Sequence, residues 1–531
     1  MASNTHPLLR PAALVLLAPF ATVAGAGAGE LNPSGSARFA NSAQVTSLAQ
    51  FGDVRPTDWA HQALTNLNER YGCVAGHTSG TYSGQRTMSR FEAAALLNAC
   101  LDRATEKTDA LKALVAEFEA ERAILYGRVD GLEKNVGLLE AQQFSTTTKL
   151  SGHATMVLGG TAFGGNAING RANTVNTVSQ GALPLTNAFT FNFDVKLILD
   201  TSLAGQDLLR TVLRGGNFDG TNNSFGGGGP TTLATLETAF QEASGPNAVG
   251  IYKLYYQAPI GGGLTLTLGP RVAQEDLLAY WPSVYPASPV LDVFTIGGAP
   301  VAINYNRGAG AGLWWQDQGW SLSAGYVAAN GSDGSPATGG LGTANAGSSG
   351  SVQLAYQQQQ WGLSVLYSAV QGGVTPYGTL NLLANGLNGA STNLTQALAL
   401  NGNWQPANPG WIPSISAGVG LNRTVFNQPQ PASTPTASRS WSVGLQWLDA
   451  LAAGNTAGMA FGQAPYATSL SGGQTANDSN WMWEWWYAFQ LSDNISITPA
   501  LFYLSRPLGQ ETPAGQNFNQ LGALLKTQFR F

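Results

Sequence analysis

The side chains best suited to chemistry lie in one segment, Val272 to Gly298, which is neither a short turn nor a Gly/Ser-rich loop. It combines three carboxylates with four aromatic rings: Glu275, Asp276, Asp292, Tyr280, Trp281, Tyr285 and Phe294. Carboxylates around a narrow, water-filled site raise the local concentration of cations and retard anions. Aromatic rings beside polar groups would also suit sugar stacking, so both classes of solute stay open.

Enzyme chemistry has little support. Most nucleophile and zinc sites need histidine, and the chain has four: His6, His61, His77 and His153. Only His153 lies beyond residue 150, and the Gly clusters at 226–229 and 261–263 lack the Lys-Ser/Thr of a phosphate loop. We therefore predict that the chain is not an enzyme and has neither a metal site nor a cofactor.

Charge and composition divide the chain near Phe144 to Lys149. Residues 1–150 hold 27 of its 55 charged residues but only one of its 14 tryptophans. The balance of 25 basic and 30 acidic residues gives no basic field, which argues against nucleic acid as a partner. We expect helices before this boundary and strands after it.

The first 28 residues resemble a secretory signal. Arg10 precedes an apolar stretch, and small residues follow, so cleavage is expected near Ala26 or Ala28. Residues 29–48 then form a linker. Beyond the signal no run approaches the roughly 20 apolar residues of a spanning helix, so any membrane span must be made of strands.

Strict alternation marks the strands. From Phe189 to Asp200 one face is Phe, Val and Leu, while the other carries Asn192, Asp194 and Lys196. This pattern fits lipid outside and water inside. Short turns and long loops alternate along residues 145–531, Trp481 to Tyr487 form an aromatic row, and about 24 residues per strand and connection predict an antiparallel barrel of about 16 strands.

The segment from Val272 to Gly298 has residues that favour burial and residues that favour water. Folding inward between two strands would satisfy both, with Lys196, Lys253 and Arg271 on the wall facing Glu275, Asp276 and Asp292. The alternative is an external loop that packs on its neighbours. An inward fold would narrow the channel.

Residues 105–143 carry apolar side chains at heptad spacing, which predicts a coiled coil of about five heptads. A single amphipathic helix lying on its own domain is the alternative. Valines at 115, 129 and 136 favour two strands. The larger lateral contacts of a barrel nevertheless favour a homotrimer, which is our expectation.

Residues 49–104 contain Phe51-Gly52-Asp53-Val54, Trp59-Ala60 and Met88-Ser89-Arg90-Phe91-Glu92 in order. This segment resembles an S-layer-homology domain, although in one copy and with His77-Thr78-Ser79-Gly80 replacing an Asp-Gly turn. The resemblance implies binding to peptidoglycan or wall polysaccharide, with Asp53, Trp59, Arg90 and Glu92 at matching positions. These side chains could instead hold the helices together, and Trp59 is expected in the core.

Two cysteines, Cys73 and Cys100, lie in this domain. Export through an oxidising compartment predicts a disulfide between them. The alternative is a pair of buried thiols that pack as small apolar groups.

The terminal strand alternates Leu521, Ala523, Leu525, Thr527 and Phe529 and ends on Phe531, as in outer-membrane proteins. With the signal, the single S-layer-homology domain and the coil, the whole chain resembles cyanobacterial porins of the carbohydrate-selective OprB type, some labelled iron-uptake porins. The resemblance implies an outer-membrane channel, with its first domain in the periplasm, surrounded by lipid and passing small solutes and ions. A mainly structural tether between membrane and wall is the alternative.

Overall fold

The computed structural model describes residues 58–60, 62–64, 66, 90–101, 109–123, 147–167, 188–228, 232–286, 290–372, 377–383, 393–408 and 410–531. The chain divides into two compact units between Ala141 and Gln142, which are described separately. The predicted signal and linker, Asp53 and Cys73 lie outside the described residues. Among those that are described, no helix has the length and apolar character to cross a membrane.

The first unit contains the helices α2 (Arg90–Leu101) and α3 (Asp109–Glu117). Its core is apolar and closed: Leu64, Leu97, Leu111, Leu114 and Phe118 are at most 2% exposed. Cys100 is buried in the same core and is disulfide-bonded. Trp59 is 52% exposed, so its expected burial is wrong; the apolar core is completed by smaller side chains from α2 and α3.

The predicted coil is described only between residues 109 and 123. There Leu111, Leu114 and Phe118 pack against the small unit's own core, and Arg122 Nε donates to Asn98 Oδ1 at 2.6 Å. This part of the segment lies on its own domain, as the alternative interpretation held. Residues 124–143 lie outside the described residues.

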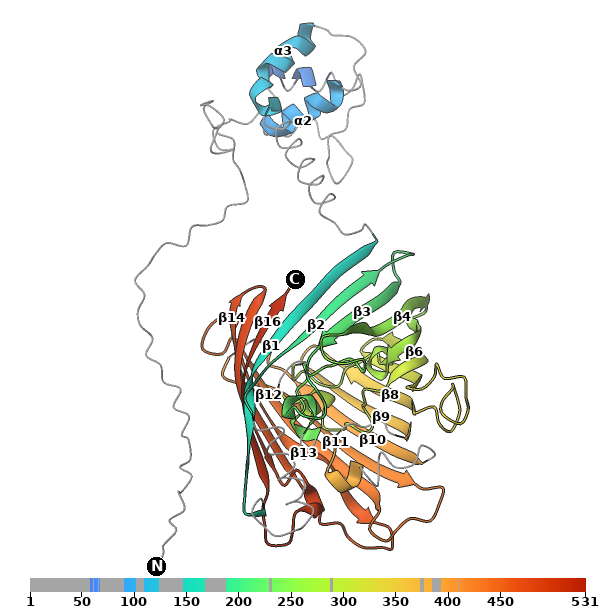
Figure 1. Cartoon of the computed structure of the whole chain (residues 1–531). Coiled ribbons are helices and arrows are strands. Elements are labelled where there is room, and N and C mark those ends of the chain that lie inside the picture. Colours follow the sequence, from blue (N-terminus) through green and yellow to red (C-terminus); the bar gives the residue numbers. More distant parts are fainter. Residues whose placement is uncertain are drawn as a thin grey trace, which may run out of the picture. The chain divides into compact units, whose positions relative to one another are not determined.

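The second unit is a closed antiparallel barrel of sixteen strands, each bonded to its neighbours in sequence (Figure 1). The strands are β1 (Thr148–Gly164), β2 (Thr190–Thr201), β3 (Leu208–Gly216), β4 (Val249–Gly261), β5 (Leu264–Ala273), β6 (Arg307–Asp317), β7 (Trp320–Ala328), β8 (Ser348–Gln357), β9 (Trp361–Gln371), β10 (Leu394–Trp404), β11 (Ser414–Val425), β12 (Pro435–Leu448), β13 (Thr456–Leu470), β14 (Trp481–Ser492), β15 (Ile495–Ser505) and β16 (Asn519–Arg530). The predicted barrel and its strand number are confirmed.

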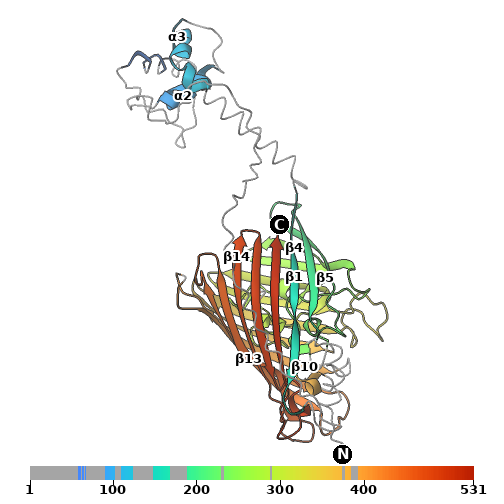
Figure 2. The ribbon, with the colours of Figure 1, turned by 60° about the vertical axis from the view of Figure 1, so that its left-hand side comes forward.

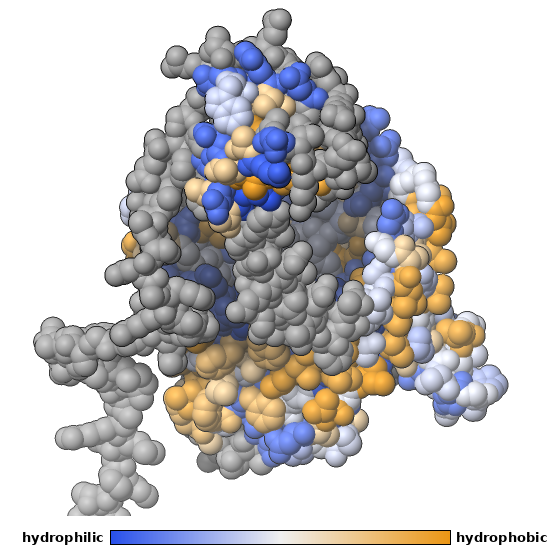
Figure 3. Space-filling view, turned by 90° about the horizontal axis from the view of Figure 1, so that it is seen from above, coloured by the Kyte–Doolittle hydropathy of each residue, from blue (hydrophilic) through white to orange (hydrophobic). Residues whose placement is uncertain are grey.

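Side chains alternate between the two faces of the wall. On β14, Trp481 and Trp485 are 43% and 48% exposed, whereas Met482 and Glu484 between them are buried. Phe191 on β2 is likewise exposed. Figure 3 shows hydrophobic residues along the outer flank of the barrel, as expected of a wall that faces lipid.

The two ends of the barrel differ. Short turns connect the strands at one end, which also carries the start of β1 and the C-terminus, and long connections occupy the other. We call these the turn end and the loop end. Figure 2 faces the closing pair, in which Gly152 and Phe531 exchange two backbone hydrogen bonds of 2.8 and 3.1 Å. The terminal Phe531 therefore belongs to the closure of the barrel.

Two long connections fold into the barrel rather than away from it. Their described parts, residues 217–228 and 232–248 between β3 and β4 and residues 274–286 and 290–306 between β5 and β6, supply about half of an internal apolar core. Phe225, Leu236, Leu291 and Ile296 are at most 2% exposed there, and Phe502 of the wall packs edge-on against Phe225. The two connections therefore fill part of the barrel interior and border the part that stays open.

Candidate functional site

The inward segment starts directly after β5. A short 3-10 helix, Gln274–Leu277, begins where the Asp276 carboxylate accepts a hydrogen bond from the Ala273 amide at 2.9 Å. Leu277 is fully buried with Tyr255, Val272 and Val327. Gly312 and Gly325 leave it room, since a Cβ on either would lie within 3.0 Å of Leu277. This packing turns the chain into the barrel.

The segment then crosses to the strands on the far side. The Ala279 amide donates to Ser323 Oγ of β7 at 2.9 Å, and the Val284 and Tyr285 amides both donate to Ser416 Oγ of β11 at 2.8 and 2.9 Å. Asn401 of β10 donates to the Gly297 carbonyl. The segment therefore spans the interior and is held by polar side chains of several strands.

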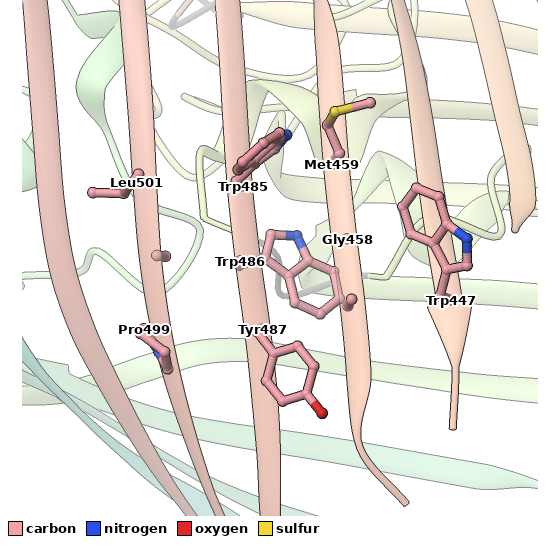
Figure 4. A pocket seen from close by; sticks show the side chains of 10 residues that line it. Trp447, Gly458, Met459, Trp485, Trp486, Tyr487, Pro499 and Leu501 are labelled. Carbon is pink, nitrogen blue, oxygen red and sulfur yellow. The ribbon is translucent and has the colours of Figure 1, made fainter. Parts of the chain in front are cut away.

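Its far contact is a single carboxylate, Glu484 of β14. Glu484 accepts from the Tyr285 hydroxyl and from the Leu291 amide, both at 2.7 Å, and Trp486 Nε1 donates to the same hydroxyl at 2.8 Å. Figure 4 shows Trp486 lying across Gly458, where a Cβ would collide with the indole. Sequence reasoning used only the outward aromatic row of this strand and missed Glu484. A lone acidic residue among tryptophans was the available signal.

A second inward connection meets the first. The Glu237 amide donates to the Val290 carbonyl at 3.1 Å, and the Asp292 amide donates to the Thr235 carbonyl at 3.0 Å, so a short antiparallel bridge joins the two. Glu237 lies at this joint, 20% exposed, with its carboxylate 3.6 Å from Lys196 Nζ of β2. Glu237 was not predicted, because nothing local in residues 217–248 indicates pairing with a distant segment.

The predicted charged residues divide into ion pairs. Lys253 Nζ lies 2.5 Å from Glu275 and 2.9 Å from Asp276. Glu275 is 32% exposed, against 12% for Lys253 and 8% for Asp276, so it presents the most carboxylate surface to the interior. Lys196, Lys253 and Arg271 were expected to face the acidic segment. Of these three, Lys253 lies directly against its carboxylates.

Two further predicted residues lie on β2 and face inward. Asp194 pairs with Arg214 at 2.6 Å, and both side chains are at most 4% exposed. The Asn192 amide donates to the Asn217 carbonyl at 3.2 Å. Both side chains are nearly closed off from the lumen, because residues 217–248 cover this stretch of the wall.

Asp292 is separate from the other two carboxylates. It accepts hydrogen bonds from Tyr377 and Thr295. Burial, reinforced by the charge of Glu237, raises the pKa of Asp292 to about 7. The three carboxylates therefore do not form one acidic cluster.

The expectation that Arg271 faces these carboxylates is wrong. Arg271 is exposed, pairs in register with Leu254, and donates to the main-chain carbonyl of Tyr252 at 3.3 Å. The register of β5 shifts between Gly269 and Val272, and such a bulge reverses which residues point inward. Val272 takes the inward position and Arg271 the outward one.

Among the described residues, no group of His, Cys, Asp or Glu side chains is arranged to hold a metal ion.

Two family models match the chain. One is described as carbohydrate-selective porin, OprB family, and covers residues 105–531; the other is the S-layer homology domain, at residues 50–94. The chain belongs to the OprB family of porins. The predicted barrel, S-layer-homology domain and outer-membrane location are confirmed.

Relatives of this porin occur in cyanobacteria. An uncharacterized protein of Nostoc sp. (strain PCC 7120) is 34% identical, over 92% of this chain and 86% of the relative. One of Synechocystis sp. (strain PCC 6803) is 31% identical, over 92% and 91%. The high-pH structure of Pseudomonas putida OprB is 13% identical, covers 76% of this chain and 97% of that one, and has a TM-score of 0.46.

Proposed function

We propose that this porin is a passive channel for small hydrophilic solutes and inorganic ions, iron among them, with a moderate preference for cations. The observation that carries the proposal is the segment at residues 274–306, which crosses the interior and exposes Glu275 more than the Lys253 paired with it. Glu237 adds a second partly exposed carboxylate at the joint of the two inward connections. Such groups at a narrow aqueous site favour cations over anions.

The test is the reversal potential of the full-length porin in a planar bilayer under a salt gradient. Glu275→Gln should lower the cation-to-anion permeability ratio, and Lys253→Met should raise it. Asp317→Asn is the matched control, because it removes a carboxylate at the end of β6 by the turn. A ratio unchanged in both interior variants would remove this segment from ion selectivity while leaving the pore.

Neutral sugars are a second candidate, favoured by the inner wall of β7–β12. Its inward side chains carry no charge, and many are serine or amide residues: Ser321, Ser323, Ser349, Ser351, Gln353, Ser364, Ser368, Asn401, Ser416, Asn422 and Ser440. These side chains are at most 6% exposed, so a neutral solute is favoured by the lack of charged side chains on this described part of the wall and not by direct contact with them. Liposome swelling with uncharged sugars of increasing size measures this permeability directly; swelling no faster than empty liposomes would exclude it.

We further propose that the S-layer-homology domain tethers the porin to peptidoglycan or a wall-linked polysaccharide. Trp59 is exposed and Glu92 lies on the surface of α2, which leaves both able to meet a ligand; Asp53 and Arg90 are the other matching positions. Purified cell walls should retain the full-length porin, and Trp59→Ala should weaken that retention. Equal recovery with walls stripped of their polysaccharide would assign binding to peptidoglycan; no retention by the folded porin would exclude the tether.

A homotrimer is the proposed assembly. Broad apolar outer walls such as that of β9, where Leu363, Val365 and Tyr367 are exposed, can pack against a neighbouring barrel. Native mass measurement in detergent, with chemical crosslinking, gives the number of chains; a monomer or dimer by both would contradict the proposal.

A further inference from the structure

The outward face of β11–β13 carries two charged side chains near the loop end. Arg423 and Arg439 are exposed, whereas Asn422, Thr424, Ser438 and Ser440 beside them in sequence are at most 8% exposed and face inward. Both arginines therefore point away from the pore. This is the side of the wall that faces lipid.

The two arginines are neighbours across the sheet. Arg423 pairs in register with Ala437, and Arg439 lies two residues further along the same strand. Such diagonal positions place the backbones roughly 7–8 Å apart. Arg439 also donates to the Tyr466 hydroxyl and lies over its ring at 5.3 Å, which fixes one guanidinium in place. The spacing allows both groups to reach one anion.

Among the described residues, neither arginine forms an ion pair with an acidic side chain. Asp449 is the only acidic residue between Ser414 and Leu470 in the sequence, and it lies in the turn at the opposite end of β12. A charge on the lipid face is tolerated near the membrane boundary but is unfavourable deeper in the membrane. Two adjacent like charges there favour an anionic partner supplied by the membrane itself.

Below Arg439 the same face presents an aromatic cluster. Trp441, Phe461 and Trp481 lie within 6.1 Å of one another by ring centroids, and Phe461 stacks on Trp481 at 5.4 Å. Phe461 and Trp481 are 40% and 43% exposed. Rings at this depth suit the junction between a lipid headgroup and its acyl chains.

We propose that β11–β13 form a binding site for a phosphate-bearing lipid of the outer leaflet. Arg423 and Arg439 hold the phosphate, because planar guanidinium groups match phosphate oxygens in pairs. Trp441, Phe461 and Trp481 contact the first part of the acyl chains. The site lies on the outside of the wall and does not depend on what passes through the pore.

The test is native mass spectrometry of the full-length porin in a nonionic detergent with added diphosphoryl lipid A. The double variant Arg423→Gln/Arg439→Gln should retain this lipid about tenfold less than the wild type, since two charge-assisted contacts are lost. Arg423→Lys/Arg439→Lys should fall between the two, because lysine keeps the charge but not the paired geometry. Arg271→Gln, an outward arginine near the loop end of β5, is the matched control and should bind as the wild type does.

Three outcomes would overturn the proposal. Equal retention by the double glutamine variant, shown by circular dichroism to be folded, would mean that the arginines only extend toward polar headgroups. Equal retention of fully dephosphorylated lipid A would remove the phosphate from recognition. Displacement of the lipid by inorganic phosphate at a concentration equal to that of the lipid would identify a site for the free anion.

Discussion

The inward segment at residues 274–306 is held by two walls of different chemistry. On the side of β2–β4 the interior is ionic, with Asp194 against Arg214 and Lys253 against Glu275. On the side of β7–β12 it is uncharged, and the contacts are hydrogen bonds to serine and asparagine such as Ser416. Removing one partner of a buried ion pair strongly destabilises the folded protein, because a charge is left uncompensated. Removing a partner of a neutral hydrogen bond costs less free energy.

The largest effect is expected on the ionic wall, at the buried pair of Asp194 and Arg214. Arg214→Gln should destabilise the barrel by about 3–5 kcal/mol, because it leaves Asp194 charged and uncompensated. Thermal unfolding in detergent measures this loss. Adding Asp194→Asn should restore most of it; a single variant as stable as the wild type would show that the two walls do not differ in this way.

A smaller loss is expected on the uncharged wall. Ser416→Ala removes the acceptor for the Val284 and Tyr285 amides, which should cost about 1–3 kcal/mol and loosen the segment. Unfolding gives the first quantity, and the noise of single-channel current gives the second. Ser440→Ala is the control, since that hydroxyl has no hydrogen-bond partner among the described residues. Matching effects in both variants would contradict the assigned role of Ser416.

A third effect is a pH dependence at Asp292. Its pKa rises from 3.8 to about 7 on folding, so the folded porin binds an extra proton between these values. The contribution of this group to stability should fall as pH rises from about 4 to about 7 and then level off. Asp292→Asn should remove that slope and unfold at a higher temperature than the wild type at pH 8. An unchanged slope would place the titration on another group.

Sequence alone predicted the parts of the fold that depend on local alternation. In the strand containing Phe191 and Asp194, the face on which each side chain lies could be predicted, because side chains in a strand alternate between two faces whatever the rest of the chain does. The direction of Arg271 could not be predicted, since one bulge, visible only in the pairing of β5 with β4 and β6, reversed it.

The candidate site was predicted in composition but not in arrangement. The mixture of rings and carboxylates in residues 272–298 indicated an inward fold, and Lys253 was correctly expected near Glu275. Glu237 and Glu484 were missed because each meets the segment through contacts between residues about 50 or 200 positions apart, here at Val290 and Tyr285. No pattern in the neighbouring sequence indicates contacts between residues so far apart in the chain.

The pairing of β1 with β16 has a consequence for the order in which the barrel assembles. All other strand pairs join neighbours in sequence and can form as successive hairpins before the two ends of the barrel meet. The register of His153 with Arg530, and of Gly152 with Phe531 beyond it, requires the last residues of the chain. Because the entropic cost of closing a loop grows only slowly with its length, this single long-range pairing adds a modest free-energy cost late in assembly. Until then the nascent sheet keeps two open edges, which a chaperone or an insertion machine must cover.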